Sequence, residues 1–333
     1  MEYELKTIEC VNALLKDLYI DLRKKVNYWS TITDQTPQAK MGYIGQHLVS
    51  AVTGYKGGKS GARGKDLIIS DTEYAEIKTC TKVDQLGFCA DCKMPVSPIE
   101  TKCSFCGSTN IERKDDSKWL INITEETPNE NTLDDSEDVL TNITRPKYYY
   151  FVLFEFENIR DNDSPIIITI YQVDPKQNGF VLCMIDYFYN LGHKTAFNMW
   201  PHMLKFSLCH PQIIYQSKIR PDNSIETIIF SPDNPVDVPF NNLRQYSRSK
   251  NLKENARNIL KEYGIDLDEA PSTEEILRTI EEYCEAYNMK NTERIEKFAN
   301  GFYKEPIQKA DEMLRAEGKE IPSVFDDFVN PLK

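Results

Sequence analysis

Two acidic residues and one lysine in segment 61–80 have the types and spacing that suit phosphodiester chemistry. Asp66 precedes a short apolar run, and Glu76 and Lys78 lie two residues apart on the next run. Residues two apart point to the same face of a strand, and in an antiparallel hairpin Asp66 meets Glu76 near its end. Two neighbouring carboxylates bind a hard cation such as Mg²⁺, and the lysine can orient a water and offset charge on phosphoryl oxygens.

Context distinguishes this Glu-x-Lys from the other copies in the chain. Glu-x-Lys also occurs at 4–6, 100–102, 112–114 and 317–319, but only the copy at 76–78 lies on a predicted strand that directly follows another strand. The alternative interpretation is an ordinary half-exposed hairpin with a Glu–Lys ion pair.

A basic, glycine-rich loop precedes the predicted hairpin. It holds Lys56, Lys59, Arg63 and Lys65 together with four glycines, so its backbone can approach a phosphate closely. A nucleotide-binding P-loop does not fit, because the first glycine of that motif would fall on Thr53 and because the expected order of strand and helix is reversed. We therefore expect the four basic residues to bind DNA.

Four of the nine cysteines form two Cys-x2-Cys pairs separated by ten residues, Cys89 with Cys92 and Cys103 with Cys106. This spacing, with a glycine after the second pair, is typical of a tetrahedral Zn²⁺ site. Four thiolates leave no position for water, so the zinc is expected to be structural. The insert, 86–116, is too small to bury a core of its own, so the metal would fold it. It would serve as a DNA-facing flap or as a stabilising staple.

The remaining patterns predict a mixed order of helices and strands. Helical stripes cover 6–27 and 38–54, the second ending at Gly54. Apolar, β-branched and aromatic runs predict strands, and they lie at 66–69, 73–79, 118–123, 147–157, 166–174, 210–219 and 224–230.

Beyond about residue 250 the chain is highly charged and helical in pattern. A basic segment before it concentrates Arg244, Arg248 and Lys250 around a tyrosine. We expect these three residues to contact DNA; a solvated linker fits the same composition.

Composition limits the class of protein. With 333 residues, 28% charged and 40% hydrophobic, the chain is typical of a globular protein with one large or two modest domains. We expect a cytoplasmic protein without a membrane partner, because no apolar run reaches the ~18 residues of a span and the start has no secretory signal. The net charge of −12 argues against a nonspecific nucleic-acid coat protein, but it allows an enzyme with local positive charge.

The helical segment before the loop, the basic glycine loop, Asp66 and the Glu76-x-Lys78 strand together resemble the restriction-endonuclease-like core of the PD-(D/E)xK nucleases. Lys65 replaces the proline of the motif. The run "GARGKDL", followed by "EIKTC" and the four-cysteine insert, resembles in particular the MamI group of type II restriction endonucleases. The resemblance covers roughly residues 40–175.

The resemblance implies a fold and a domain organisation. It implies an α/β fold with a mixed β-sheet core flanked by helices, a zinc-ribbon-like insert and a helical C-terminal region. We expect residues 1–240 to form the nuclease core, with the zinc-binding insert at 86–116. Residues 241–333 would form a helical region for dimerisation or DNA contact.

The resemblance also implies an activity. Asp66 and Glu76 would be Mg²⁺ ligands and Lys78 the catalytic lysine of a site-specific endonuclease acting on double-stranded DNA. Many members carry an acid on the preceding helix; Gln46 stands there, so it would bind a water or remain a helix-surface residue. Cleaving two strands requires two sites, so we expect a homodimer. A cognate DNA methyltransferase, not directly bound, would complete the restriction–modification system.

Two alternatives remain at this point. A DNA repair or junction-resolving nuclease would keep the fold and change the substrate. A non-catalytic zinc-ribbon DNA-binding module would make the acidic hairpin incidental, and replacing Glu76 or Lys78 would then leave function unchanged.

Overall fold

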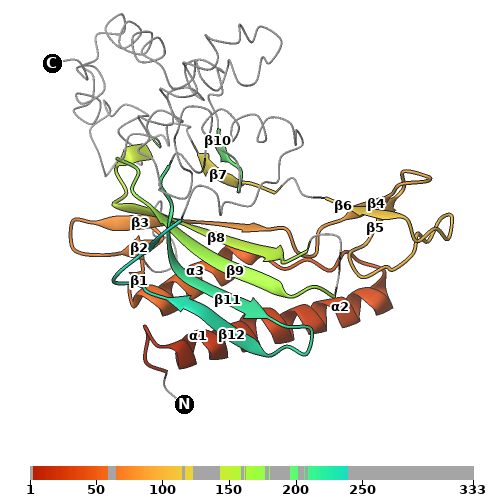
Figure 1. Cartoon of the computed structure of the whole chain (residues 1–333), viewed down its shortest axis with the longest axis horizontal. Coiled ribbons are helices and arrows are strands. Elements are labelled where there is room, and N and C mark those ends of the chain that lie inside the picture. The colour runs from red at the N-terminus through yellow and green to blue at the C-terminus, as the bar shows by residue number, and fades with distance from the viewer. Residues whose placement is uncertain are drawn as a thin grey trace, which may run out of the picture. The chain divides into compact units, whose positions relative to one another are not determined.

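The largest element of the fold is an eight-stranded mixed β-sheet with the order β1-β2-β3-β8-β9-β11-β12, in which β13 also pairs with β11 (Figure 1). This confirms the predicted α/β class with a mixed central sheet. The strands are β1 (Lys56–Gly57), β2 (Leu67–Ile68), β3 (Tyr74–Thr81), β8 (Tyr148–Phe156), β9 (Ile166–Val173), β11 (Gln212–Ile219), β12 (Ile225–Phe230) and β13 (Val236–Asp237).

The computed structural model of the chain describes residues 3–58, 65–114, 117–122, 143–158, 161, 163–176, 180, 196–201, 206 and 209–238. The predicted helical region 241–333 therefore lies outside the described residues. The chain divides into two compact units. One comprises Met1–Trp119, Tyr148–Gln172 and Gln212–Val236; the other comprises Leu120–Lys147, Val173–Pro211 and Asp237–Lys333.

The centre of the sheet is a parallel pair, β3 and β8, flanked by antiparallel pairs. Glu76 lies opposite Tyr149 and Lys78 opposite Phe151 in this pair, while β2 runs antiparallel to β3 and β11 antiparallel to β9. Parallel neighbours need a long crossover connection, and here it contains the cysteine-rich insert. Almost every residue of β8 and β9 is buried, which explains their continuous apolar and aromatic runs.

The helices are α1 (Ile8–Leu15), the π-helical turn η1 (Lys16–Asp21), α2 (Leu22–Thr33) and α3 (Met41–Thr53). Thr7 caps α1 by accepting a hydrogen bond from the amide of Cys10. α3 ends at Gly54, which has a φ of 79° and forms the left-handed C-cap that the sequence predicts. α1 to α3 lie along one face of the main sheet (Figure 1). No helix among the described residues is long and apolar enough to cross a membrane.

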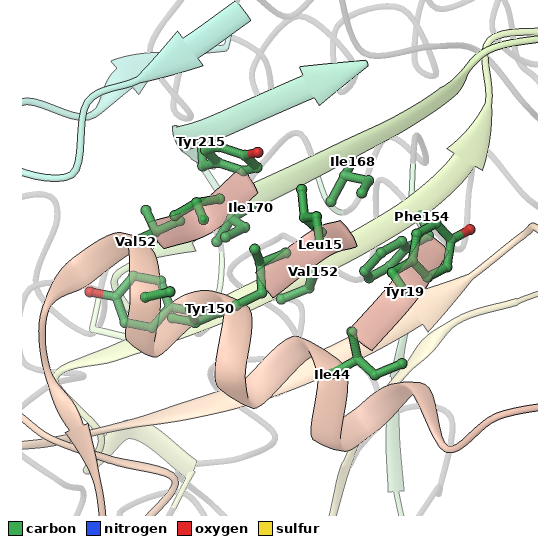
Figure 2. Close-up of a cluster of buried hydrophobic side chains, with 14 of the residues drawn as sticks. Leu15, Tyr19, Ile44, Val52, Tyr150, Val152, Phe154, Ile168, Ile170 and Tyr215 are labelled. Atoms are coloured by element: carbon green, nitrogen blue, oxygen red, sulfur yellow. The ribbon is translucent and has the colours of Figure 1, made fainter. Parts of the chain in front are cut away.

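The main core lies between these helices and the sheet (Figure 2). α1, η1 and α3 contribute side chains from one side, and β8, β9 and β11 from the other. Leu15, Val52 and Ile168 have no exposed surface, so the apolar face of each helix is closed against the strands. The residues labelled in Figure 2 belong to this cluster: Leu15, Tyr19, Ile44, Val52, Tyr150, Val152, Phe154, Ile168, Ile170 and Tyr215.

Two smaller sheets complete the described strands. β4 (Gly87–Cys89), β5 (Pro95–Val96) and β6 (Ile111–Arg113) form a three-stranded sheet in the order β5-β4-β6, all within the cysteine-rich insert. β7 (Trp119–Asn122), predicted as a further strand, pairs with β10 (Ala196–Met199) and not with the main sheet.

Candidate active site and metal centre

β3 presents Glu76 and Lys78 on one face of the main sheet. Ala75 and Ile77, which alternate with them, are buried on the helix side. The Lys78 Nζ lies 2.9 Å from the Glu76 Oε2, and the two side chains are 23% and 14% exposed. This shared face is the arrangement that the spacing of the two residues predicts.

Asp66 immediately precedes β2 and contacts the backbone of β3. The β2–β3 pairing includes Leu67 opposite Ala75, and extending this antiparallel register by one residue would set Asp66 opposite Glu76. The amide of Ile77 donates a hydrogen bond of 2.8 Å to the Asp66 Oδ2. The Asp66 carboxylate therefore lies against the backbone of β3 between Glu76 and Lys78, and a metal site shared by the three residues stays a prediction.

α3 contributes Gln46 to the same site. Its Nε2 donates a hydrogen bond of 2.7 Å to the Asp66 Oδ1. The contact is possible because α3 lies very close to β3: a Cβ on Gly45 would be 1.9 Å from the Thr79 Oγ1. Gln46 is thus neither a plain helix-surface residue nor a group that contacts the site only through water.

Tyr149 is a site neighbour that the sequence analysis did not identify. It lies opposite Glu76 in the parallel pair and is 3% exposed. Burial raises the pKa of its phenol well above the ordinary value, and the charges of Glu76 and Tyr74 raise it further. Tyr149 is therefore neutral and adds no charge next to Glu76. The sequence shows the tyrosine-rich run at the start of β8, but it does not show the parallel pairing that places Tyr149 opposite Glu76.

Only part of the predicted DNA-binding set lies in the described residues. Lys56 on β1 and Lys65 next to Asp66 are both exposed, and the Lys65 ammonium lies over the Tyr74 ring, 5.4 Å from its centroid. The other predicted DNA-binding residues, Lys59, Arg63, Arg244, Arg248 and Lys250, lie outside the described residues.

The four predicted cysteine ligands converge in the insert. The sulfur atoms of Cys89, Cys92, Cys103 and Cys106 all lie within 4.8 Å of one another. Two of the separations are 3.5 Å, between Cys89 and Cys106, and 3.6 Å, between Cys92 and Cys103. A tetrahedral metal with bonds of about 2.3 Å to sulfur would place its ligands about 3.8 Å apart, so this cluster fits such an ion.

The local chain conformation forms this cluster. Gly107 has a φ of 75°, and its amide donates to the Cys103 carbonyl at 2.8 Å, which closes the turn around the second cysteine pair. Lys93 likewise donates its amide to the Cys89 carbonyl at 2.8 Å. Cys89, Val96 and Cys103 are the buried residues of the small core of the insert. Two of the four cysteines, Cys89 and Cys103, are therefore both candidate metal ligands and core residues.

The insert leaves the main sheet at the end of β3. Thr81 is five residues beyond Glu76, or about 16 Å along the strand at ~3.3 Å per residue. After the insert the chain comes back to the end of β3 at Ser117, whose hydroxyl donates a hydrogen bond of 2.7 Å to the Thr81 carbonyl. A contact between the insert and DNA near the cleaved bond stays a prediction.

These features define an α/β protein with an acid–lysine group on its central sheet and a separate four-cysteine centre. The sequence model described as "MamI restriction endonuclease" matches residues 28–244, and this span contains both sites. The chain belongs to the MamI restriction endonuclease family, a family of nucleases and therefore of hydrolases. This confirms the resemblance found in the sequence. Searches of curated proteins and of solved structures found no match.

Proposed function

We propose that this protein is a Mg²⁺-dependent type II restriction endonuclease that hydrolyses phosphodiester bonds of double-stranded DNA at a specific sequence. The observation that carries the proposal is the approach of Asp66 to the strand that holds Glu76 and Lys78: its carboxylate accepts from the amide of Ile77, the residue between them. In a member of a restriction endonuclease family, this arrangement supports a PD-(D/E)xK active site with Lys65 in place of the proline.

The charges of the group fit a divalent cation. Glu76 is paired with Lys78, whereas the hydrogen bonds of Asp66 within the described part of the chain come from two neutral donors, Gln46 and Ile77. The three ionised side chains therefore sum to −1. An ionised carboxylate has about four acceptor positions, so each Asp66 oxygen retains a position for a metal ion.

Each residue has a definable role in hydrolysis. When bound, a divalent cation polarises a phosphoryl oxygen and lowers the pKa of a bound water. Asp66 and Glu76 would hold that cation. The Lys78 ammonium would orient the attacking water for in-line displacement and stabilise charge on the phosphoryl oxygens. By analogy with the family, the products would carry 5′-phosphate and 3′-hydroxyl ends.

The four-cysteine centre would hold Zn²⁺ as a structural ion. All four ligands are thiolates, which leaves no open position for a catalytic water. The described residues of the insert bury a core of three side chains, so the insert needs the metal for its fold. In this proposal it belongs to a nuclease core of residues 1–240.

The proposed partners follow from the reaction. Exposed Lys56 and Lys65 lie near the site and would neutralise DNA phosphates, together with Lys59, Arg63, Arg244, Arg248 and Lys250. Cutting both strands of a duplex requires two active sites, so we propose a homodimer, with residues 241–333 contributing to dimerisation or DNA contact. A cognate methyltransferase would protect the host DNA without binding this protein.

The test is cleavage of unmethylated phage DNA with Mg²⁺ and with EDTA, followed by mapping of the fragment ends. We expect discrete fragments with Mg²⁺ only, and equal cutting of branched and linear duplexes that carry the site. Lys78→Ala should abolish cutting and retain DNA binding.

Lys218→Ala is the matched control. Lys218 is also a strand lysine paired with a glutamate, Glu157, at 2.7 Å, and its side chain is 24% exposed, compared with 23% for Lys78. The control should cut like the wild type. Equal loss in both variants, or no loss in Lys78→Ala, would refute the assignment of the site.

A further inference from the structure

Asp66 is held from two sides by elements that do not depend on DNA or metal. The Gln46 Nε2 contacts one carboxylate oxygen at 2.7 Å, and the Ile77 amide contacts the other at 2.8 Å. A flipped Gln46 amide would turn its carbonyl oxygen toward the carboxylate, so the donor orientation is the stable one. Both Asp66 oxygens therefore have fixed directions.

The two donors belong to a pair of tightly packed elements. Gln46 follows Gly45, whose backbone lies against Thr79 of β3, and Ile77 is on the same strand. Because Gly45 has no side chain, α3 and β3 come close enough for the glutamine to reach Asp66. Hydrogen bonds that orient a metal-binding carboxylate typically change metal affinity by about 10–100-fold when removed.

The neutrality of Gln46 has a separate consequence. Asp66 and Glu76 supply two negative charges, and Lys78 offsets one of them. A second divalent cation would need further anionic oxygens, and at the helix position that contacts Asp66 the chain has an amide. An amide hydrogen directed at Asp66 also occupies the place that a ligand oxygen would need.

We propose that Gln46 is a positioning residue that fixes the Asp66 carboxylate and restricts the site to one divalent cation. This inference rests on the proposed function, since it concerns the same metal site. Gln46 acts through Asp66 and does not contact the reacting atoms.

The experiment is a Mn²⁺ titration of the zinc-loaded protein followed by EPR, which reports metal binding without turnover. Glu76→Gln protein corrects for Mn²⁺ bound elsewhere. Gln46→Met keeps the length of the side chain and removes the N–H donor, and it should weaken Mn²⁺ binding by about 10–100-fold. Gln46→Glu replaces the donor by an acid and should bind a second Mn²⁺ per chain. His47→Ala, at the exposed neighbouring position, should bind like the wild type.

The outcomes separate this inference from the proposed function. Wild-type affinity in Gln46→Met overturns the positioning role, and a single Mn²⁺ in Gln46→Glu overturns the restriction to one cation, while both leave the nuclease proposal intact. If wild type and Glu76→Gln bind Mn²⁺ equally, the metal site itself is wrong and the proposed function fails with it.

Discussion

Replacing Gly45 by alanine should destabilise the protein because the backbone of α3 packs directly against Thr79 of β3 there. The added Cβ would lie 1.9 Å from the Thr79 Oγ1 and 3.0 Å from the Thr79 Cβ, well inside van der Waals contact. Overpacking of this kind costs about 1–3 kcal/mol, and a contact this short belongs at the upper end. Alanine gains about 0.5–1 kcal/mol of helix propensity over glycine. The net loss is therefore about 2 kcal/mol.

Gly42 provides the matched comparison on the same helix. A Cβ added at Gly42 meets nothing within 4 Å, so Gly42→Ala should be neutral or stabilising by up to about 1 kcal/mol. Urea unfolding measures both variants. With an m-value of about 2 kcal/mol/M, the midpoint of Gly45→Ala should fall by about 1 M, and that of Gly42→Ala should stay or rise.

A second substitution tests the cause. Thr79→Ala removes an oxygen that is buried without a hydrogen-bond partner in the described part of the chain, so alone it should cost little. In Gly45→Ala/Thr79→Ala the 1.9 Å contact is absent, and most of the lost stability should return. The double variant should therefore be more stable than the sum of the two single changes predicts. A Gly45→Ala protein as stable as Gly42→Ala, or additive free energies, would refute this account of the packing.

Three further predictions concern the insert, the core and the basic surface. Cys103→Ser, or removal of the metal by a chelator, should abolish hydrogen-exchange protection in 87–113 and leave β8 protected, because Cys103 is both ligand and core. Burial raises the pKa of Tyr150. The neutral phenol therefore stabilises the fold fully below the ordinary tyrosine pKa of ~10, and this stability is lost progressively as the pH rises from there through the raised pKa. Tyr150→Phe should therefore lose less stability than the wild type in alkaline urea titrations. Lys65→Ala should weaken DNA binding equally on all sequences and lower the slope of log K against log salt by about one.

Each of these has an outcome that contradicts it. Retained protection in the metal-free insert would show that its strands fold without the ion. An identical alkaline loss in Tyr150→Phe would assign that loss to other groups. Sequence-dependent weakening in Lys65→Ala would mean that Lys65 reads a base and does not only contact phosphate.

The positions of most elements followed from local patterns. The strands β8, β9, β11 and β12 coincide with the predicted apolar runs, and Gly54 ends α3 as expected. The N-terminal stripe was only partly right. In a regular helix, apolar residues at Val11, Leu15 and Leu18 would share one buried face, yet Leu18 is 36% exposed while Tyr19 and Ile20 are 4% and 5% exposed. The π-helical turn Lys16–Asp21 adds a residue to the repeat and shifts the buried face by one.

The site was predictable where it depended on short spacing. Glu76 and Lys78 share a face because a strand has a period of two, and the cysteine pairs converge because their spacing is local. The contacts of Gln46 and Tyr149 depend on how α3 and β8 pack against β3. Such long-range pairings leave no local periodicity, so sequence patterns alone could not assign them.

The most direct measurement of the central claim is the single-turnover rate of Mg²⁺-dependent DNA cleavage by Asp66→Asn and Glu76→Gln proteins. Both substitutions keep the shape of the side chain and remove its charge, and DNA binding in Ca²⁺ provides the control for folding. We predict rates at least about 10²-fold below that of the wild type with unchanged DNA affinity. Wild-type cleavage by either variant would show that the bond is hydrolysed at another site.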